Sequence, residues 1–534
     1  ADVTSVSATG ATVLAVGDLN GDSYPDLVTT LSGSSNNIGV FVQNIRAFQS
    51  LTLTAVTSTN VGLTSSVVVV RSISPSNLIS GANTSTYSIT TTTGGGSATL
   101  SNGVLTAIGT GNITLTVVAA GDTNYRPIST SQVITIGKGT PTLVITSSGL
   151  FSVGTSVSVT VTNTAIGGSS LSYSVSGGSG SATLAGTVLT AVSIGAVTLT
   201  VNSVGNTNYY PASVSQLIQI FYAPGGVGGN MTLWLRADVG ISSTVNNVGQ
   251  WSDQSGSISS SAQAKKTATA NTVLSSSGLN YNPVISFLAN GNSSASTEYF
   301  NGSFPAAQLA GTILVVSRPN MTYDFPALFQ IYETTNNAPG ANIAYLAAGR
   351  YLVTSSAGHD GNGPAVVSGV PYVTAALFPS NNTAVGSQIG NNGVLVNTAN
   401  TGSFTTNGSN FYVGRWAANN STNGFTTYQG DIAEVVYYNR AITTTELVRT
   451  QSYLAVKYGL HLDPTAIPNY LASDGSVLWG GVSNTGYTSA IVGIGRDDNS
   501  GLLQYQTRSS AGADILTLGL GAITTSNASN IASN

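Results

Sequence analysis

The chain has 534 residues, of which 15 are basic and 19 acidic, so only 6% carry a charge, against about 25% in an average globular protein. A net charge of −4, without clusters of lysine or arginine, excludes a protein that binds nucleic acid or an anionic membrane surface. The absence of cysteine excludes a disulfide framework and a thiol nucleophile, and no apolar run approaches the ~20 residues of a membrane-spanning helix.

Residues 1–46 form the first predicted unit, with β-type runs at 11–16, 27–30 and 38–43. The loop after the first run carries oxygen donors at alternate positions, namely the side chains of Asp18, Asn20, Asp22 and Asp26 and the carbonyl of Tyr24. Alternate oxygens on a tight loop can converge on Ca²⁺, which takes roughly six to eight oxygen ligands. Thr29 stands where an EF-hand has glutamate, so we predict a structural calcium site on a β-hairpin. The alternative is a hydrogen-bonded Asx turn.

A self-similar unit marks residues 50–138 and 139–222. The segment Ser97-Ala98-Thr99-Leu100 returns 84 residues later as Ser181-Ala182-Thr183-Leu184, and the segment 121–125 (GDTNY) returns as 205–209 (GNTNY). Runs that alternate Val/Ile/Leu with Ser/Thr lie roughly 8–12 residues apart in each repeat, separated by Gly/Ser/Asn turns. The pattern predicts two tandem β-sandwiches, joined by a short link that contains Pro141 and aligns them semi-rigidly.

The segment 223–229 (APGGVGG) marks the next boundary. Beyond it, β-type runs such as 313–316, 344–346 and 411–413 alternate with long polar loops, which is typical of a larger jelly-roll sandwich. Trp234 and Trp251 are predicted to lie in the core of this sandwich.

One amphipathic helix is predicted at 443–458. Thr443 can cap its first turn and Glu446 stands three residues later, which is a capping box. Three apolar residues share one face and a glycine is placed to end the helix: Leu447, Leu454, Tyr458 and Gly459. The tail, residues 461–534, returns to β-type runs around Gly475 and a polar turn at 496–501. The predicted fold class is therefore all-β, with this single helix.

Several segments carry a resemblance to known families. The loop from Asp18 to Asp26 resembles an FG-GAP/VCBS-type repeat, the calcium-loop motif of propeller blades, and residues 50–222 resemble two bacterial Ig-like repeats. The segments 233–238 (LWLRAD) and 250–256 (QWSDQSG), with the strand 430–441 and the helix after it, resemble a concanavalin A-like (laminin-G-like) domain, here residues 230–460.

The combination is similar to large secreted and cell-surface proteins of the Bacteroidota, including adhesins exported by their type 9 secretion system. The resemblance implies an extracellular or cell-surface location, which a surface of Ser, Thr, Asn and Gly also favours, since few groups titrate or are screened by salt. One blade is too few for a propeller, and the last residues do not resemble an export-signal domain. We therefore expect a segment of a longer polypeptide.

The concanavalin A-like resemblance implies two kinds of binding site. Asp253 is a candidate ligand for a second Ca²⁺, with an Asp that caps a turn as the alternative. A lectin-type site stacks a sugar on an exposed aromatic ring, and the candidates for glycan binding are Trp416, Tyr351 and Tyr412, each of which could instead be an ordinary sandwich residue.

The sequence does not favour catalysis. With His359 and His461 as its two histidines it has no HExxH metal motif, and no Gly-x-Ser-x-Gly elbow accompanies them. Jelly-roll glycosidases use two carboxylates on one strand face, but Asp431 and Glu434 are three residues apart and are predicted to point to opposite faces.

We therefore predict a non-enzymatic surface adhesin or stalk, whose repeats extend and present a jelly roll that contacts a glycan or a protein. The alternative is a subunit of an extracellular filament or sheath assembled by β-strand addition, because a nearly uncharged surface removes repulsion between copies. A dedicated glycan-binding lectin module is a third interpretation.

Overall fold

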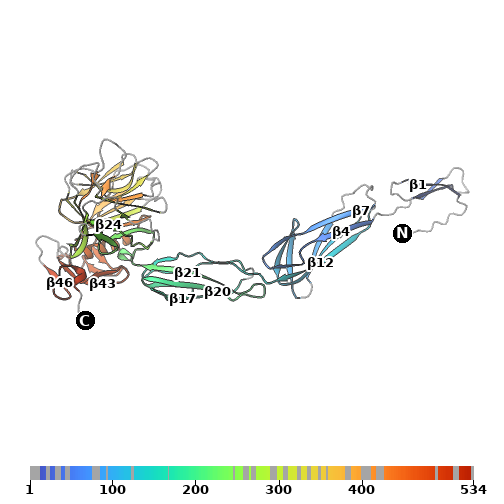
Figure 1. The fold of residues 1–534 in the computed structure, drawn as a ribbon, viewed down its shortest axis with the longest axis horizontal. Helices are drawn as coiled ribbons and strands as arrows, with labels where there is room; N and C mark the ends of the chain where they lie inside the picture. The colour runs from blue at the N-terminus through green and yellow to red at the C-terminus, as the bar shows by residue number, and fades with distance from the viewer. Residues whose placement is uncertain are drawn as a thin grey trace. The chain divides into compact units, whose positions relative to one another are not determined.

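The computed structural model describes most of the chain: residues 12–17, 19, 25–30, 38–41, 48–74, 85–91, 94–121, 125–165, 168–244, 247–256, 264–265, 272–288, 298–304, 311–320, 326–333, 338–346, 350–355, 359–378, 387–397, 410–416, 426–487, 491–508 and 516–530. Within these residues the chain consists of β-strands, one α-helix and two short 3-10 helices (Figure 1), which confirms the predicted all-β class. The chain packs as two compact units. The first contains residues 1–146, 160–173 and 200–215, and the second contains 147–159, 174–199 and 216–534.

The first unit begins with a three-stranded antiparallel sheet in the order β1-β2-β3. Its strands coincide with the three predicted runs: β1 (Thr12–Gly17), β2 (Asp26–Thr30) and β3 (Ile38–Phe41).

Two strand sets with the same sheet orders follow (Figure 1). The first set is β4 (Phe48–Thr54), β5 (Ser58–Asn60), β6 (Thr64–Ser66), β7 (Val68–Ser74), β8 (Ser85–Thr91), β9 (Ser97–Ser101), β10 (Val104–Gly109), β11 (Gly111–Ala119) and β12 (Ile128–Gly137). The second is β13 (Leu143–Ile145), β14 (Leu150–Ser152), β15 (Ser156–Ser158), β16 (Val161–Asn163), β17 (Leu171–Ser176), β18 (Ser181–Ala185), β19 (Val188–Ser193), β20 (Gly195–Ser203) and β21 (Ala212–Phe221).

The sheet β5-β12-β11-β8 of the first set corresponds to β14-β21-β20-β17 of the second, β6-β10-β9 to β15-β19-β18, and β4-β7 to β13-β16. The self-similarity of the sequence is therefore a repeat of structure. Below, repeat 1 means strands β4–β12 and repeat 2 means β13–β21.

The alternating sequence of β11 explains why this strand forms. Ile113, Leu115 and Val117 point into the sandwich and are fully buried, while Thr114 and Thr116 lie on the opposite, partly exposed face. β-Branched residues fit a pleated, half-buried surface, so a strand with this alternation is stable where one face meets a core.

Two larger sheets form the sandwich of the second unit. One has the order β26-β27-β40-β29-β34-β35-β36, with β22 also paired to β40, and the other has the order β23-β24-β25-β28-β37-β30-β31-β32-β33. The strands of the eight-stranded sheet are β22 (Met231–Arg236), β26 (Thr272–Leu279), β27 (Asn282–Leu288), β29 (Gly311–Pro319), β34 (Tyr372–Phe378), β35 (Gln388–Asn391), β36 (Val394–Asn397) and β40 (Gln429–Tyr438). Those of the nine-stranded sheet are β23 (Ile241–Thr244), β24 (Asn247–Trp251), β25 (Ala264–Lys265), β28 (Phe300–Ser303), β30 (Ala327–Glu333), β31 (Ala338–Leu346), β32 (Arg350–Ser355), β33 (His359–Ala365) and β37 (Asn410–Val413).

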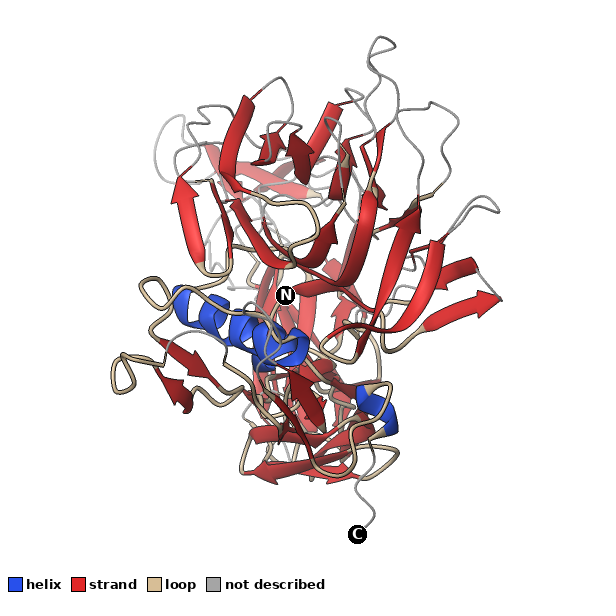
Figure 2. Cartoon of the chain, turned by 90° about the vertical axis from the view of Figure 1, so that its left-hand side faces the viewer, coloured by secondary structure: helices blue, strands red, loops and turns tan. Residues whose placement is uncertain are grey.

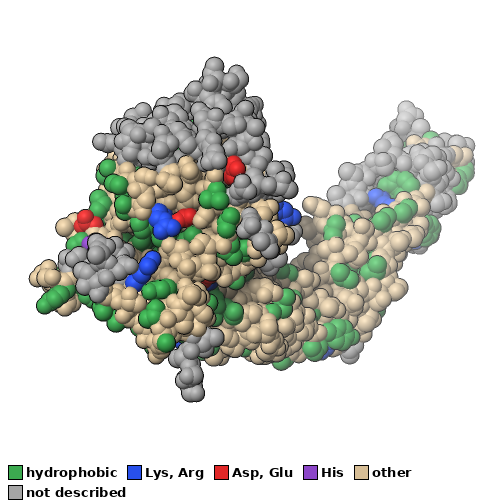
Figure 3. Space-filling view, turned by 60° about the vertical axis from the view of Figure 1, so that its left-hand side comes forward, with side chains coloured by type: hydrophobic (Ala, Val, Ile, Leu, Met, Phe, Trp, Pro, Cys, Tyr) green, Lys and Arg blue, Asp and Glu red, His purple; other side chains and the backbone are tan. Residues whose placement is uncertain are grey.

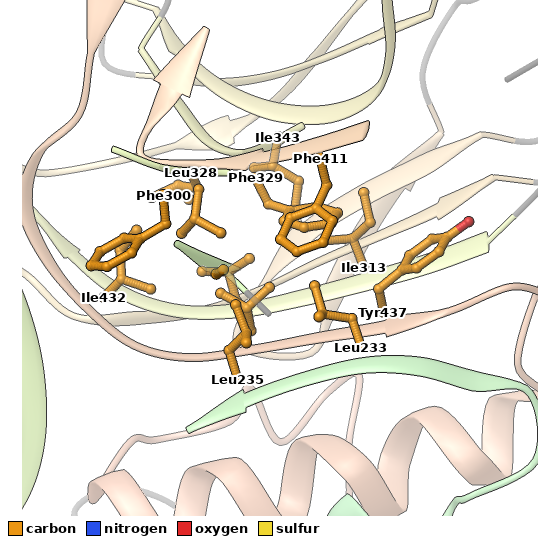
Figure 4. Packing of buried hydrophobic residues seen from close by; sticks show 14 of the residues in the cluster. Leu233, Leu235, Phe300, Ile313, Leu328, Phe329, Ile343, Phe411, Ile432 and Tyr437 are labelled. Atoms are coloured by element: carbon orange, nitrogen blue, oxygen red, sulfur yellow. The ribbon is translucent and has the colours of Figure 1, made fainter. Parts of the chain in front are cut away.

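The core between these two sheets is aromatic and aliphatic (Figure 4). Leu233 and Ile313 of the eight-stranded sheet meet Phe300 and Phe411 of the nine-stranded sheet. Trp251 belongs to this cluster, while Trp234 lies on the opposite face of β22 in a second cluster. Both tryptophans are buried, as predicted.

The helix α1 (Thr444–Tyr458) covers the outer face of the eight-stranded sheet (Figure 2). The structure confirms its predicted signals: Thr443 accepts from the Glu446 amide in a capping box, and Gly459 ends the helix in a left-handed conformation. Leu447, Leu454 and Tyr458 lie on its buried face. In the described part of the chain, no helix combines the length and apolar character that a membrane span requires.

The tail supplies three short antiparallel ribbons beside α1: β41 (Asn469–Leu471) with β42 (Val477–Gly480), β43 (Gly495–Asp497) with β44 (Leu502–Gln504), and β45 (Gln506–Arg508) with β46 (Thr517–Gly519). The remaining elements are η1 (Pro224–Gly226), η2 (Asn527–Ser529) and the ribbon of β38 (Arg415–Trp416) and β39 (Thr426–Thr427). Leu460, Leu462, Tyr470 and Leu502 join the cluster beneath α1, so the tail shares a core with the sandwich.

Candidate ligand-binding surface and buried charge network

Strand β37 places Tyr412 on the outer face of the nine-stranded sheet. Its neighbours Phe411 and Val413 point into the sandwich core, so the alternation of the strand turns Tyr412 away from it. Asn301 of β28 and Gln330 of β30 stand directly opposite Tyr412 in the ladder. Asn301 is half-buried, so its amide can donate and accept hydrogen bonds at the surface beside Tyr412, whereas Gln330 is fully buried.

Arg415 links Tyr412 to a second aromatic ring. Its guanidinium carbon lies 4.3 Å from the centroid of Tyr299 and 5.8 Å from that of Tyr412, and the two ring centroids are 5.9 Å apart. Both tyrosines and the arginine are half-buried. A guanidinium stacked on an aromatic face is attracted by the ring quadrupole, so the three groups hold one another in place.

Trp416 extends the same surface. It lies in β38, next to Arg415, and packs against Ala327 and Ala344 while remaining half-buried. We call Tyr299, Tyr412, Arg415 and Trp416 the aromatic platform. The structure thus places two of the three predicted glycan-binding candidates, Tyr412 and Trp416, on consecutive strands of the chain, β37 and β38. The third, Tyr351, lies in β32 opposite Tyr345 of β31, and its side chain is outside the described residues.

The predicted calcium loop falls largely outside the described residues: this holds for Asp18, Asn20, Asp22 and Tyr24. Asp26 is described. It opens β2, is buried, and accepts a hydrogen bond from the Leu19 amide over 2.7 Å. Within the described residues, no group of three or more His, Asp and Glu side chains is arranged to hold a metal ion.

Asp253, the second predicted calcium ligand, receives hydrogen bonds at both of its carboxylate oxygens. Oδ1 accepts from the amides of Trp234 (2.7 Å) and Ser255 (3.0 Å), and Oδ2 accepts from the Ser255 hydroxyl (2.6 Å). Burial raises the pKa of Asp253 to about 6, and these hydrogen bonds oppose the increase. The contacts are those of a carboxylate that caps a turn and ties it to β22.

The two carboxylates of β40 have separate partners. Asp431 accepts from the Ser286 hydroxyl over 2.6 Å and pairs with Arg318, whereas Glu434 is fully buried among groups of β22 and α1. A register shift in the β29–β40 ladder lies between them, so strand alternation is broken there. The spacing of three residues, on which the prediction of opposite faces rests, therefore does not decide which face each carboxylate occupies. Of the histidines, His359 has a side chain outside the described residues, and burial lowers the pKa of His461.

A buried charge network under α1 was not predicted from the sequence. Lys457 of α1 donates to Glu434 over 2.8 Å and to Asp238 over 3.2 Å, and Asp238 in turn accepts from Arg236 over 2.7 and 3.0 Å. Two positive and two negative groups thus balance in a network whose inner pair, Lys457 and Glu434, is buried, whereas Arg236 and Asp238 lie toward the surface. The sequence signal that could have revealed it is a lysine four residues after Tyr453, on the face that α1 buries.

Aromatic groups complete this network. The indole of Trp234 and the hydroxyl of Tyr458 donate to the two carboxylate oxygens of Glu434, over 2.6 and 2.8 Å. Burial alone raises the pKa of Asp238, but the charges of Lys457 and Arg236 outweigh it and hold that pKa well below its usual value. Elsewhere the visible surface is mainly uncharged, with isolated charged side chains (Figure 3). Four of the few charged residues of this chain thus belong to the network that holds α1 on the sandwich.

Two sequence families match parts of the chain. The FG-GAP repeat matches residues 10–39, which confirms the FG-GAP resemblance of the loop from Asp18 to Asp26. A family described as a domain of unknown function (DUF8202) matches residues 446–534, from the first turn of α1 to the last residue. Neither match covers half of the chain. A comparison with curated proteins gives no match.

Three solved structures illustrate the structural likenesses. Domain 4 of AbnA, a GH43 extracellular arabinanase from Geobacillus stearothermophilus, is 14% identical, with a TM-score of 0.29 over 42% of this chain and 97% of that one. The Trypanosoma rangeli sialidase is 10% identical (TM-score 0.31; 81% of this chain, 66% of that one), and the Ruminococcus gnavus IT-sialidase CBM40 is 16% identical (TM-score 0.23; 34% and 96%). At these values the likenesses carry no argument about ligand or activity.

Proposed function

We propose that the chain is a non-enzymatic, extracellular surface protein whose tandem repeats present the sandwich of residues 230–460, and that this sandwich binds a glycan through the aromatic platform. The location, the adhesive role and the assignment to type 9 export in the Bacteroidota rest on the sequence resemblance. The choice of ligand rests on the geometry of the platform.

The observation that carries this proposal is the combination of aromatic rings with the half-buried amide of Asn301 beside Tyr412. A sugar ring offers C–H groups on its face and hydroxyls around its rim, so it suits an aromatic face bordered by hydrogen-bonding groups. Tyr412 and Asn301 supply this combination on two adjacent strands. Because these groups belong to regular strands, they are positioned before a ligand arrives, which reduces the entropic cost of binding.

The two outer faces of the sandwich differ in what covers them. The outer face of the eight-stranded sheet is covered by α1 and the tail, while the outer face of the nine-stranded sheet carries the half-buried platform. A non-enzymatic function is proposed because Asp431 and Glu434, the candidate carboxylate pair, are engaged by Arg318 and Lys457. Carboxylates held in this way are poorly suited to exchange protons with a substrate.

A glycan array probed with the full chain tests the proposal. We expect binding to a defined group of glycans, and we expect Tyr412→Ala and Trp416→Ala to weaken it strongly. Tyr487→Ala is the matched control, because Tyr487 is an aromatic residue of the tail that is 78% exposed and lies outside the platform. An array without hits, or a loss of binding in the control alone, would contradict the assignment.

The three-stranded sheet favours a second candidate function, a filament subunit. In the order β1-β2-β3, the two outer strands have one paired edge each among the described residues, and an open edge can pair with a strand of another copy. Electron microscopy of the native material, with and without EDTA, separates the candidates. Fibres with a constant axial repeat support the filament, and separate molecules support the adhesin. We also propose that the loop of residues 18–26 binds Ca²⁺ and orders this sheet.

A further inference from the structure

Repeat 1 ends in a small backbone-lined socket. Three hydrogen bonds define it: the Val61 amide donates to the Gly137 carbonyl (3.0 Å), the Gly62 amide to the Ala107 carbonyl (2.9 Å), and the Ala107 amide to the Leu63 carbonyl (3.1 Å). Gly62 has a φ of +88°, a left-handed conformation that favours glycine. We use the word socket for residues 61–63, 107 and 137–139, and for their counterparts in repeat 2.

A turn from repeat 2 fills the socket of repeat 1. The Gly139 amide donates to the Asn208 carbonyl and the Tyr210 amide donates to the Gly139 carbonyl, both over 2.9 Å. The ring of Tyr209 packs into the core of repeat 1, and a Cβ atom at Gly62 would lie 3.6 Å from the Tyr209 hydroxyl. The turn from repeat 2 thus closes the end of the preceding sandwich.

Repeat 2 has the same socket. The Val153 amide donates to the Phe221 carbonyl (2.9 Å), the Gly154 amide to the Ala191 carbonyl (2.9 Å), and the Ala191 amide to the Thr155 carbonyl (3.0 Å). Phe221 and Ala191 each lie 84 residues after their counterparts in repeat 1, and Gly154 likewise has a positive φ, of +80°. The hydrogen-bond pattern is therefore repeated together with the sequence.

The tail fills this second socket with the turn between β43 and β44. The Ala223 amide donates to the Asn499 carbonyl over 3.4 Å, and Ala223 is the residue that corresponds to Gly139 of repeat 1. A Cβ atom at Gly154 would lie 2.8 Å from the Asn499 side-chain amide. A Cβ atom at Gly501 would lie 2.7 Å from the ring of Tyr222. Glycine is favoured at both positions, because the backbone there is left-handed and a side chain would press against the facing residue.

We propose that the region 446–534, which matches the DUF8202 family, is a docking module. Its turn at residues 497–501 plugs the socket of the sandwich repeat that precedes the glycan-binding sandwich. The partner that this turn fits is a β-sandwich repeat with a left-handed glycine in its socket, as found in repeats 1 and 2. In the socket of repeat 2, the turn 497–501 thus takes the place that the Asn206–Tyr209 turn of repeat 2 takes in the socket of repeat 1.

The turn is held within the tail, and the tail is connected to the sandwich. At the turn, Asp497 accepts from the amide of Ser473, another residue of the tail, over 2.9 Å. Farther along the tail, a buried amide network ties β44, β45 and η2 to the β26–β27 hairpin: Asn280, Asn282, Gln504, Gln506, Asn527 and Asn530. Asn280 and Asn282 also donate to the Lys457 carbonyl at the end of α1, over 3.1 and 2.5 Å. Because the amide network holds the tail on the sandwich, docking of the turn 497–501 in the socket also fixes the sandwich to repeat 2.

Distance measurements between spin labels test the proposal on the full chain. The chain has no cysteine, so labels attach only at introduced ones, for example Ser174→Cys in repeat 2 and Thr445→Cys in α1, both at exposed positions. We expect a single narrow distance distribution. Gly154→Leu and Gly501→Leu, which obstruct the junction from its two sides, should each broaden that distribution.

Matched glycine variants provide the controls. Gly186 of repeat 2 (φ +62°) and Gly475 of the tail (φ +88°) have the same left-handed strain, but a Cβ atom there would meet no neighbour within 4 Å. Gly186→Leu and Gly475→Leu should therefore keep the narrow distribution, with circular dichroism confirming that all four variants fold. An unchanged distribution in both junction variants, or equal broadening in the controls, would overturn the proposal. The distance measurement does not involve glycan binding. A failure of the docking proposal can therefore be distinguished from a failure of the proposed function.

Discussion

The ammonium group of Lys457 lies 2.8 Å from a carboxylate oxygen of Glu434 and 3.2 Å from one of Asp238, which precedes it by 219 residues. The Glu434 side chain is fully buried and that of Lys457 is 4% exposed. One lysine thus connects the C-terminal turn of α1 to strand β40 and to the turn that follows β22. Because the charges balance, the network tolerates burial, and the removal of one member leaves an uncompensated charge.

Replacing Lys457 by methionine should destabilise the second unit strongly. Methionine keeps most of the apolar stem but leaves Glu434 and Asp238 without their shared partner, a change that typically costs roughly 3–5 kcal/mol. Denaturant unfolding followed by tryptophan fluorescence measures it, because Trp234 donates to Glu434. The exposed pair of Arg496 and Asp498 is the control, and Arg496→Ala should leave the free energy of unfolding unchanged. Equal effects of the two substitutions would show that burial of the network is unimportant.

Stability should fall between about pH 4 and pH 6 because of Asp253. Its pKa rises from 3.8 to about 6 on folding, so the folded state holds a proton that the unfolded state releases in this range. The expected loss is up to about 3 kcal/mol as the pH rises, with no further change above pH 6. The depressed pKa of Asp238 acts in the opposite sense: its contribution is present above the ordinary Asp pKa and is lost as the pH falls below it.

The substitution Asp253→Asn isolates the effect of Asp253. Asparagine can still accept from the Trp234 amide but does not titrate, so the unfolding free energy of this variant should lose the decline between pH 4 and 6. Asp498→Asn, at an exposed position, should retain it. A decline that persists unchanged in Asp253→Asn would assign the titration to another group.

Local sequence signals predicted the local structure well. The capping box of Thr443 and Glu446 and the glycine at 459 delimit α1 as expected, because each signal acts within one helical turn. The first three strands begin within one residue of their predicted runs, because β-type alternation between turn residues is also a short-range pattern.

Long-range contacts could not be predicted in this way. Nothing near Asn280 in the sequence indicates that its side chain reaches the carbonyls at the end of α1, more than 170 residues later. The same holds for the aromatic platform. Tyr412 and Trp416 were predicted as separate candidates, and Tyr299 lies beside Tyr412 only because β28 pairs with β37. Strand order in a large sandwich depends on pairings that local periodicity does not encode.

Replacing Tyr209 by alanine should weaken the junction between the repeats. Its side chain is 3% exposed and packs in the core of repeat 1, although it belongs to repeat 2. The truncation should cost roughly 3–5 kcal/mol and separate the unfolding transitions of the two repeats. Its neighbour Tyr210 is 54% exposed, so Tyr210→Ala should change neither. Calorimetry of both variants provides the comparison, and a single unshifted transition for Tyr209→Ala would disprove the coupling.

Substitutions at the platform should separate stacking from hydrogen bonding. Tyr412→Ala removes the aromatic face and is expected to weaken glycan binding roughly tenfold or more, while Tyr412→Phe keeps the face and most of the affinity. Arg415→Lys keeps the charge but loses the planar guanidinium that stacks 4.3 Å from Tyr299, so it should weaken binding by disordering the rings. Titration calorimetry with a glycan from the array gives these affinities. Equal affinity of Tyr412→Ala and the parent would place the site elsewhere.

Calcium should stabilise the N-terminal sheet through the loop that the FG-GAP match covers. A ligand that binds the folded state alone contributes about 2.7 kcal/mol at a hundredfold excess over its Kd, so added Ca²⁺ should raise the melting temperature of this sheet and EDTA should lower it. Asp22→Asn removes one charged ligand and should abolish most of the shift. Asp253→Asn distinguishes a second site: a reduced calcium response in this variant would make Asp253 a ligand, whereas an unchanged response assigns all of the effect to the loop. Identical melting curves with Ca²⁺ and with EDTA would leave the loop as an Asx turn, because only a bound cation links the stability of the sheet to calcium.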